Sequence, residues 1–531
     1  MAKKNAIIQI GGESLRFPKE ILDKFNYISL PGNYDFISDK ERIRIFQADL
    51  FNPKMSRNIY IFGKDATLLQ NFPKLLEQFP AYQIFFDKSA KINDEQRSIL
   101  KKKFSIAIDL DDLSTLHNSF EKFLDLATPQ YGYKLSMDNL YVREDFKGTI
   151  TKKGNVCLEM TGEFEENMSQ IITWKIHPHG INAQSKLAFI PETRIISGDI
   201  ELLYKIFLID QVTNDITDIV MGTPEEFRAQ EKIIKNLTDV NKFIGLSLSA
   251  KGGTGSIEIG QSHFRNYLSD GSIMIPNGKR LIDTEVRHEE LYHYFHPGDM
   301  KPPLAVYFSG YRSAEGFEGR GMMGRMGCPF MLIGDPRLEG GNFYLGSDEL
   351  EKQVVKVIKE KLEWLGFSNE QLILSGLSMG TFGSLYYAKD LEPAAIIIGK
   401  PLANIGTIAL NERINRPEVW GTSLDMVTHF GGKSQNSVAK ALDRKFWDKF
   451  EMGHYDKTTF AIAYMKDDDY DGEAFPMIAS SLKKYSPEAK VLHKGFIGRH
   501  NDNSPGVNTW FLKQYRNILW HHYGRKIDYR V

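Results

Sequence analysis

Residues 371–387 read QLILSGLSMGTFGSLYY, and this stretch decides the fold of the region around it. A short apolar run typical of a buried strand comes first, and Gly376-Leu377-Ser378-Met379-Gly380 follows it. Small and aromatic residues at helical spacing come next. A G-x-S-x-G pattern arises by chance roughly 0.2 times in a chain of this composition, so the motif alone is not specific. Its meaning therefore depends on the strands and helices around it.

The flanking sequence has the pattern of a doubly wound α/β sheet. Near-continuous apolar runs, as in buried parallel strands, occur at 303–311 and 329–335, and further strand-like segments occur at 371–375, 394–400, 458–465 and 490–496. Amphipathic segments lie between these runs, and residues 401–455 form a largely helical insertion. Repeated β-α units of this length need helices on both faces of the sheet. We therefore predict a C-terminal α/β-hydrolase domain over 286–531.

Two regions of different character precede this domain. Residues 1–130 alternate short apolar runs with helical stretches and lack a nucleotide-binding fingerprint, which predicts an N-terminal α/β domain. Residues 131–285 consist of strand-like runs divided by turn residues, which predicts a β-sandwich. Sandwiches attached to enzymes often bind carbohydrate, but that expectation rests on analogy alone.

The composition limits the kind of partner and the compartment. The 531 residues carry a formal net charge of -1, which gives no basic field for nucleic acid. Cys157 and Cys328 are the two cysteines, and they indicate a reducing compartment without a disulfide framework or a Cys-based zinc site. The sequence shows neither a signal peptide nor an apolar run long enough to span a membrane. We expect a soluble cytoplasmic protein without a metal or a tightly bound cofactor.

Ser378 occupies the position of a nucleophile on a strand-to-helix elbow. A strained turn exposes the serine oxygen, and the flanking glycines allow a close backbone approach. The N–H of Met379, at the start of the helix, points where a tetrahedral oxyanion would form. A second donor is expected from the loop after the strand at 303–311, with the N–H of Tyr311 or of Gly310 as candidates.

A serine nucleophile needs a base and an orienting acid, in the chain order Ser, acid, His. His500, in GFIGRHNDNSPG, follows the last strand and is our candidate base; His493 lies within that strand and fits less well. The acid is expected after the strand at 458–465, where the sequence reads KDDDYDGEAF. Asp467, Asp468, Asp469 and Asp471 compete for this role, with Glu473 as a further possibility, and spacing cannot separate them. We favour Asp468, with Asp469 next and Asp471 third.

Four segments together resemble a known family. They are YHYFHPGDMKPPLAVYFSGYR (292–312), GGNFYLGSDELE (340–351), LSGLSMGTFGSLYY (374–387) and YMKDDDYDG (464–472). They resemble the second of the accessory secretory proteins of the Gram-positive accessory Sec system, and the likeness extends over the whole chain in length and domain order. The 292–312 run is the most particular, since the elbow alone fits any α/β-hydrolase.

The resemblance implies two roles. One is a carbohydrate O-acetyltransferase that acetylates N-acetylglucosamine on a serine-rich repeat adhesin, with Ser378 as nucleophile, His500 as base and a carboxylate within 467–471 as acid. The other is a separate requirement in exporting the glycosylated adhesin, together with the sister accessory secretory proteins and an accessory SecA motor. Membrane contact at the translocon would then come through these partners. The sequence does not identify the acetyl donor.

The chemistry of the triad leaves other functions open. The same residues fit a serine esterase or other hydrolase, and whether water or a sugar takes the acyl group depends on how the site excludes water. The 316–327 loop and the 401–455 insertion are candidate covers for such a site. A hydrolase fold that works only as a non-catalytic export scaffold is the third possibility.

Overall fold

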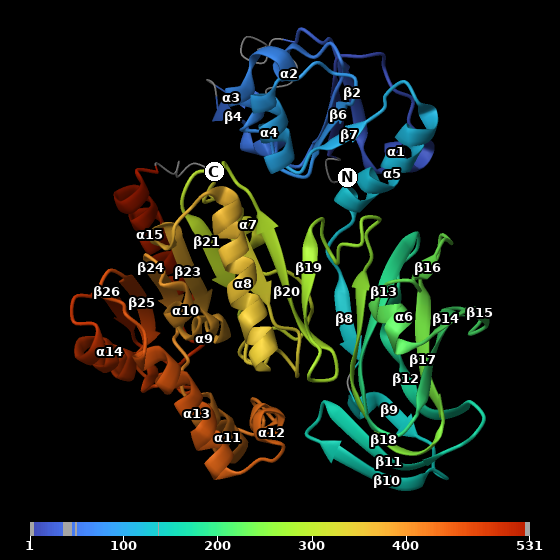
Figure 1. The fold of residues 1–531 in the computed structure, drawn as a ribbon, viewed down its shortest axis with the longest axis vertical. Coiled ribbons are helices and arrows are strands. Elements are labelled where there is room, and N and C mark those ends of the chain that lie inside the picture. The colour runs from blue at the N-terminus through green and yellow to red at the C-terminus, as the bar shows by residue number, and fades with distance from the viewer. Residues whose placement is uncertain (1–4, 35–44, 48–49, 136, 526–531) are drawn as a thin grey trace.

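The structure, a computed structural model, describes residues 5–34, 45–47, 50–135 and 137–525. Within these residues, four sheets of at least five strands group into three parts along the chain. Figure 1 shows an N-terminal α/β part in blue, a pair of sheets in cyan and green, and a large sheet with its helices in yellow to red. The chain is thus a mixed α/β protein with several sheets.

The N-terminal part is a parallel sheet in the order β2-β1-β5-β6-β7. Its strands are β1 (Ala6–Ile10), β2 (Asn26–Leu30), β5 (Ile59–Phe62), β6 (Ile84–Asp87) and β7 (Ile106–Ile108), and β3 (Phe46–Gln47) pairs with β4 (Leu50–Phe51) beside it. Its helices are α1 (Lys19–Lys24), α2 (Thr67–Asn71), α3 (Pro73–Leu76), α4 (Asp94–Lys102) and α5 (Leu113–Ala127). Ile7 and Ile8 are neighbours in β1 that belong to two different buried clusters, so both faces of this sheet are covered.

The second part packs two antiparallel sheets face to face around one apolar core. One sheet has the order β10-β11-β18-β13-β16, with β8 also paired to β18; the other has the order β15-β14-β17-β12-β9. The first contains β8 (Gly132–Leu135), β10 (Lys147–Lys153), β11 (Cys157–Phe164), β13 (Ser185–Ser197), β16 (Ile234–Asn236) and β18 (Gly253–Asn266). The second contains β9 (Leu140–Val142), β12 (Ser169–Ile181), β14 (Glu201–Asp210), β15 (Ile216–Gly222) and β17 (Lys242–Lys251), and α6 (Pro224–Arg228) follows β15. This arrangement is a β-sandwich.

The third part is an eight-stranded sheet in the order β19-β20-β22-β21-β23-β24-β25-β26. The six strands from β22 to β26 run parallel, whereas β20 is antiparallel to both of its neighbours. The strands are β19 (Gly278–Asp283), β20 (Glu289–His296), β21 (Leu304–Phe308), β22 (Phe330–Gly334), β23 (Leu372–Leu377), β24 (Ala395–Gly399), β25 (Thr459–Met465) and β26 (Lys490–Phe496). Ligands in such open sheets bind beyond the carboxyl ends of the parallel strands.

Helices cover both faces of this sheet, as two separate buried clusters show. They are α7 (Arg320–Gly324), α8 (Asp348–Leu365), α9 (Met379–Tyr386), α10 (Ala388–Leu391), α14 (Ala474–Tyr485) and α15 (Ser504–Tyr523). The insertion after β24 folds as α11 (Ile405–Asn415), α12 (Asp425–Gly431) and α13 (Asn436–Glu451). None of the helices that the structure describes is long and apolar enough to cross a membrane.

The strand β19 lies on the sandwich side of the boundary that we placed at residue 285. It pairs instead with β20 and forms the edge of the eight-stranded sheet. The sequence could not show this, because a short strand with alternating burial reads the same in either sheet. The chain thus enters the eight-stranded sheet a few residues earlier than its composition suggests.

Buried charged side chains build the junction between the sandwich and the eight-stranded sheet. His263 and Arg265, both on β18, bind Glu315 in the loop that follows β21. The other ring nitrogen of His263 lies 3.0 Å from Oε1 of Glu192 on β13, and Arg265 also pairs with Glu290 on β20. All five residues are buried. Because a buried charge is tolerated only when it is paired, this network holds the sandwich against the loop after β21.

The network makes the stability of the junction depend on pH. Burial opposes the charge on His263, but Glu315 and Glu192 raise the pKa of this histidine to about 9 from its ordinary 6.5. The stabilisation from protonated His263 is therefore complete below pH 6.5 and is lost as the pH rises through about 9.

We expect His263→Gln to destabilise the protein at about pH 6 more than at about pH 9.5, with a difference of roughly 3 kcal/mol in the free energy of unfolding. Denaturant unfolding of the wild type and the variant at both pH values measures it. The exposed His493, replaced in the same way, serves as the matched control for the loss of an imidazole outside this network. A penalty for His263→Gln that is constant over this range would contradict a protonated His263.

Candidate active site

Ser378 lies on a strained turn between β23 and α9. Its backbone has φ 52° and ψ -122°, a combination that a residue with a side chain rarely adopts. The N–H of Ser378 donates to the carbonyl of Gly399 at the end of the neighbouring strand β24, over 2.9 Å. Thr381 N–H donates in turn to the carbonyl of Ser378. The turn is thus fixed on both sides, as a strand-to-helix nucleophile elbow requires.

Two glycines let the elbow pack more closely than side chains would allow. A Cβ atom on Gly380 would lie 2.0 Å from the carbonyl oxygen of Phe308, at the end of β21. A Cβ atom on Gly376 would lie 2.2 Å from the carbonyl oxygen of Gly380 itself. Since the obstacles are backbone atoms, neither clash can be relieved by a side-chain rotation. The glycines of the motif therefore allow α9 to pack closely against β23 and β21.

A continuous chain of hydrogen bonds joins Ser378, His500 and Asp468. Ser378 Oγ lies 2.9 Å from His500 Nε2, and His500 Nδ1 lies 2.8 Å from Asp468 Oδ2. Asp468 follows β25 and His500 follows β26, so the carboxyl ends of three parallel strands supply the three residues. His500 is 3% exposed, which leaves little room for water to compete for its ring nitrogens. The structure thus brings together the serine, the histidine and the favoured acid of the sequence analysis.

Asp468 is held in the ionised form. Burial raises the pKa of this carboxyl, but the hydrogen bond and charge of His500 outweigh it, together with two backbone N–H groups. The pKa of Asp468 therefore lies below its usual range. The two N–H groups are those of Tyr470 and Asp471, which donate to Oδ1 over 2.9 and 3.2 Å. An ionised acid at this place fixes the tautomer of His500 in which Nε2 can accept the proton of Ser378.

The two alternative acids have other partners. Asp469 accepts the backbone N–H of His500 over 3.0 Å and forms an ion pair with Arg416 of the helical insertion, 2.7 Å apart. Asp471 accepts the N–H groups of Ala403 and Asn404, each over 2.8 Å, and so fixes the chain that leaves β24. Only Asp468 among the three contacts a ring nitrogen of His500 in the described structure.

The candidate oxyanion donors differ in their surroundings. Met379 is the first residue of α9, and the first N–H groups of a helix have no acceptor within it. The N–H of Gly310 donates to Glu318 Oε2 over 2.7 Å, so in this arrangement it is engaged. Within the described residues, the N–H of Tyr311 donates to no other group of the protein. This favours the Met379 and Tyr311 amides as the pair of donors.

Two charged residues beside the elbow were not anticipated from the sequence. Glu318, besides binding Gly310, lies next to the hydroxyl of Tyr307. Lys400 directly follows β24 and donates to Ser504 Oγ over 3.2 Å. Burial lowers the pKa of Lys400, while the charges of Asp468 and Glu318 partly counteract this. A lysine at the carboxyl end of a buried strand, in IIIGK, is a signal that could have identified it.

The helical insertion contacts the loop that carries Asp468. Arg416, just after α11, binds Asp469 and also lies 4.6 Å from the ring centroid of Tyr470. Tyr470 in turn lies 4.7 Å from the ring of His500. The other candidate cover, the 316–327 loop, buries both Met323 and Met326 in the apolar core. The insertion, rather than these methionines, therefore borders the site.

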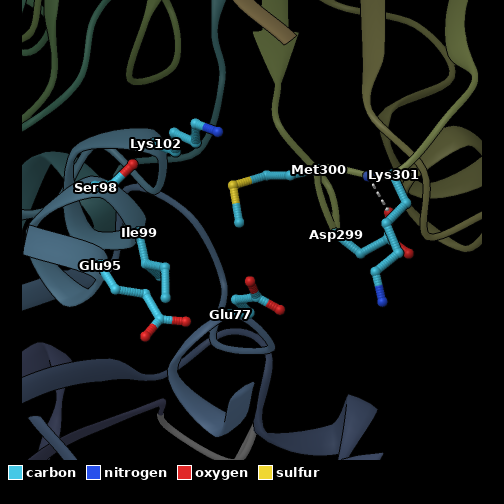
Figure 2. A pocket seen from close by; sticks show the side chains of 8 residues that line it. All are labelled: Glu77, Glu95, Ser98, Ile99, Lys102, Asp299, Met300 and Lys301. Carbon is cyan, nitrogen blue, oxygen red and sulfur yellow. Dashed lines mark hydrogen bonds between the residues drawn. The ribbon is translucent and has the colours of Figure 1, made fainter. Parts of the chain in front are cut away.

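Two hollows in the surface lie away from the triad. One, of about 320 Å³, lies between the N-terminal part and the turn after β20, and Figure 2 shows the side chain of Met300 pointing across it toward α4. Its lining is mostly charged and consists of Glu77, Glu95, Ser98, Ile99, Lys102, Asp299, Met300 and Lys301. The other, of about 570 Å³, is lined by residues between 90 and 97. Among the described residues, no three His, Cys, Asp or Glu side chains cluster so as to hold a metal ion.

The chain is similar to known proteins over nearly its whole length. Residues 6–525 match a family described as the accessory Sec system GspB-transporter. An accessory Sec system protein of Staphylococcus aureus is 36% identical over 99% of this chain and 98% of that protein. Its namesake from Streptococcus gordonii is 37% identical over 99% of this chain and 100% of that protein. A chain in the solved Glycosylation Associate Protein complex from Streptococcus agalactiae is 34% identical, with a TM-score of 0.80 over 98% of this chain and 99% of that one.

We expect Asp468→Asn to lower the rate of p-nitrophenyl acetate hydrolysis by about three to four orders of magnitude. An amide at this position favours the wrong tautomer of His500, with Nε2 protonated and unable to take the proton of Ser378. Asp469→Asn is the matched control, since Asp469 binds the backbone N–H of His500 but not its ring. Steady-state kinetics of both variants measure the difference, and equal losses would contradict the assignment of Asp468.

We also expect Gly380→Ala to destabilise the protein by about 3 kcal/mol or to prevent folding, because the added methyl meets the backbone of β21. Thermal unfolding measures the loss. The control is Gly324→Ala in α7, where no atom lies within 4 Å of the new Cβ and the change should stay within about 1 kcal/mol. Similar unfolding temperatures for the two variants would show that the close approach at the elbow is not required.

Proposed function

This chain belongs to the accessory Sec system GspB-transporter family, and we propose that within it the chain is a serine-dependent carbohydrate O-acetyltransferase. Its acceptor is N-acetylglucosamine on a serine-rich repeat adhesin. The observation that carries the proposal is the unbroken hydrogen-bonded chain from Ser378 Oγ through His500 to Asp468. A scaffold would need none of these contacts, and each of the three residues lies at the end of a different strand.

The first step is the transfer of an acetyl group to the enzyme. His500 Nε2 takes the proton of Ser378 Oγ as this oxygen attacks the acetyl carbonyl of the donor. The carbonyl oxygen becomes negative and accepts hydrogen bonds from the Met379 and Tyr311 amides. The bond to the donor's leaving group then breaks, and the proton on His500 passes to that group. Ionised Asp468 stabilises the positive charge on His500 throughout.

The second step returns the enzyme to its starting form. A sugar hydroxyl gives its proton to His500 Nε2 and attacks the carbonyl carbon of acetyl-Ser378. The same two amides stabilise the second tetrahedral intermediate. When this intermediate collapses, the ester bond to Ser378 breaks and Oγ recovers the proton from His500. The products are the O-acetylated sugar and free enzyme, so the cycle consumes one donor and one acceptor.

The chain also has a role in export that does not depend on this reaction. The family is one of accessory Sec system transporters, and the relative from Streptococcus agalactiae belongs to a multi-protein complex. These observations support the sister accessory secretory proteins as partners. The accessory SecA motor and the glycosylated adhesin complete the set that we propose, and they would bring the chain from the cytoplasm to the translocon at the membrane.

We expect Ser378→Ala to remove acetyl groups from the glycans of a co-expressed serine-rich repeat adhesin, because the variant lacks the atom that carries the acetyl group. Mass spectrometry of the glycans detects the loss as the mass of one acetyl group per site. His500→Ala should have the same effect, while His493→Ala, on the strand before it, should leave the glycans acetylated.

Two other outcomes separate the alternatives. Glycans that keep their acetyl groups in Ser378→Ala would rule out the transferase, and hydrolysis of p-nitrophenyl acetate by wild type but not by the variant would then indicate an esterase. If neither reaction depends on Ser378 while export depends on the chain, the protein is a scaffold. Adhesin export, followed separately in the same strains, should survive Ser378→Ala.

A further inference from the structure

Three partly exposed aromatic side chains lie beside the triad, and the two reaction steps do not use them. Tyr311 is 39% exposed and follows Gly310, and a Cβ atom on Gly310 would lie 3.3 Å from the carbonyl oxygen of Leu377, next to the nucleophile. Trp420 comes from the helical insertion and is half-buried. Tyr470, also half-buried, comes from the acid loop. Three separate segments thus bring aromatic rings to one place.

Contacts between the rings tie them to the site. The rings of Tyr311 and Trp420 meet edge to face, with centroids 5.6 Å apart. The ring of Tyr470 lies 4.7 Å from that of His500. Burial, Glu339 and, to a smaller extent, Tyr470 raise the pKa of Tyr311, so the two phenol groups are close enough to influence each other. The aromatic rim formed by Tyr311, Trp420 and Tyr470 therefore lies beside the triad.

The rim is held in place by its neighbours. The ring of Tyr311 lies against Gly340, where a Cβ atom would come within 2.3 Å of it, so only a glycine leaves room for the ring. The rings of Phe343 and Trp420 are stacked, with their centroids 6.5 Å apart. Such fixed rings lose little conformational entropy when a ligand packs on them, which favours a binding role over that of loose surface residues.

Charged groups lie between and around the rings. Glu339 is exposed, accepts a hydrogen bond from Thr422 and lies next to the hydroxyl of Tyr311. The guanidinium of Arg416 lies over the ring of Tyr470 at 4.6 Å. Carboxylates accept hydrogen bonds from hydroxyl groups, and a guanidinium donates to hydroxyl or amide oxygens. The rim thus combines apolar faces with fixed polar groups, the composition of a site for a ligand that is apolar on its faces and polar at its edge.

We propose that the aromatic rim is the acceptor subsite, where Trp420 and Tyr311 hold a pyranose ring by stacking against its C–H face. This inference rests on the proposed transferase function and names the residues that select a sugar over water. A pyranose carries C–H groups on its faces and hydroxyl groups around its edge, which matches the rings and the polar groups of the rim. A bound sugar next to acetyl-Ser378 displaces water and so favours transfer over hydrolysis.

The experiment compares how acetyl-enzyme divides between sugar and water. The full-length protein is acylated with p-nitrophenyl acetate in the presence of increasing N-acetylglucosamine, and acetylated sugar and free acetate are measured. For Trp420→Ala we expect the ratio of transfer to hydrolysis to fall roughly five- to tenfold, through a higher KM for the sugar. Trp420→Phe, which keeps a ring, should recover most of the ratio.

The matched control is Trp520→Ala, a tryptophan that is 51% exposed and lies near the C-terminal end of α15, whereas His500 precedes the start of that helix. It should keep the wild-type ratio. A ratio for Trp420→Ala equal to that of wild type would overturn the proposal, as would equal losses of transfer and hydrolysis that Trp420→Phe does not recover. If Ser378→Ala formed acetylated sugar and acetate as fast as the wild type, the proposed function itself would be disproved. The two failures are therefore distinguishable.

Discussion

The close approach of helix α9 to strands β21 and β23 is the constraint on which the rest of the site depends. Without side chains at positions 376 and 380, backbone meets backbone at distances that a Cβ atom would make impossible. This contact fixes Ser378 in its strained conformation and places the start of α9 beside the loop after β21. The nucleophile and both candidate oxyanion donors are therefore positioned by a single packing arrangement, and the histidine and acid need only to reach it.

The sandwich supports this arrangement from the side. His263 and Arg265 bind Glu315, which follows Gly310 and Tyr311 in the same loop. The loop that carries two candidate oxyanion donors is therefore anchored to another part of the molecule. Lys134, also from the sandwich, donates to the carbonyl of Pro336 over 2.7 Å. That contact fixes the segment before Gly340, against which the ring of Tyr311 packs. The sandwich thus holds the loops around the candidate site in place.

The sequence was informative where chemistry depends on chain order and uninformative where it depends on how a turn is folded. Ser378 and His500 could be predicted because each follows a segment that reads as a strand. The three aspartates could not be separated by spacing; the turn directs Asp468 to His500, Asp469 to Arg416 and Asp471 to the segment after β24.

Residues of the helical insertion could not be predicted at all. Arg416 and Trp420 are more than 30 residues from the nearest member of the triad, and a helical segment does not reveal which residues after it face the site. The N-terminal strands show the same limit. The buried runs of β1, β5 and β6 were evident, whereas β2 is half-exposed and carries no clear period. A strand can thus be predicted from the sequence when both of its faces are buried, but not when it is half-exposed.

Two charged side chains beside the elbow, Glu318 and Lys400, bear on the proposed reaction. Glu318 takes the N–H of Gly310, and a carboxylate near a developing oxyanion raises its free energy. Lys400 lies close enough to both Glu318 and Asp468 to interact with their charges, so it offsets part of this repulsion. In the proposed reaction, the Met379 and Tyr311 amides would then stabilise the negative oxygen of the intermediate. In the proposed mechanism Tyr311 would therefore serve twice, with its N–H as an oxyanion donor and its ring as part of the acceptor subsite.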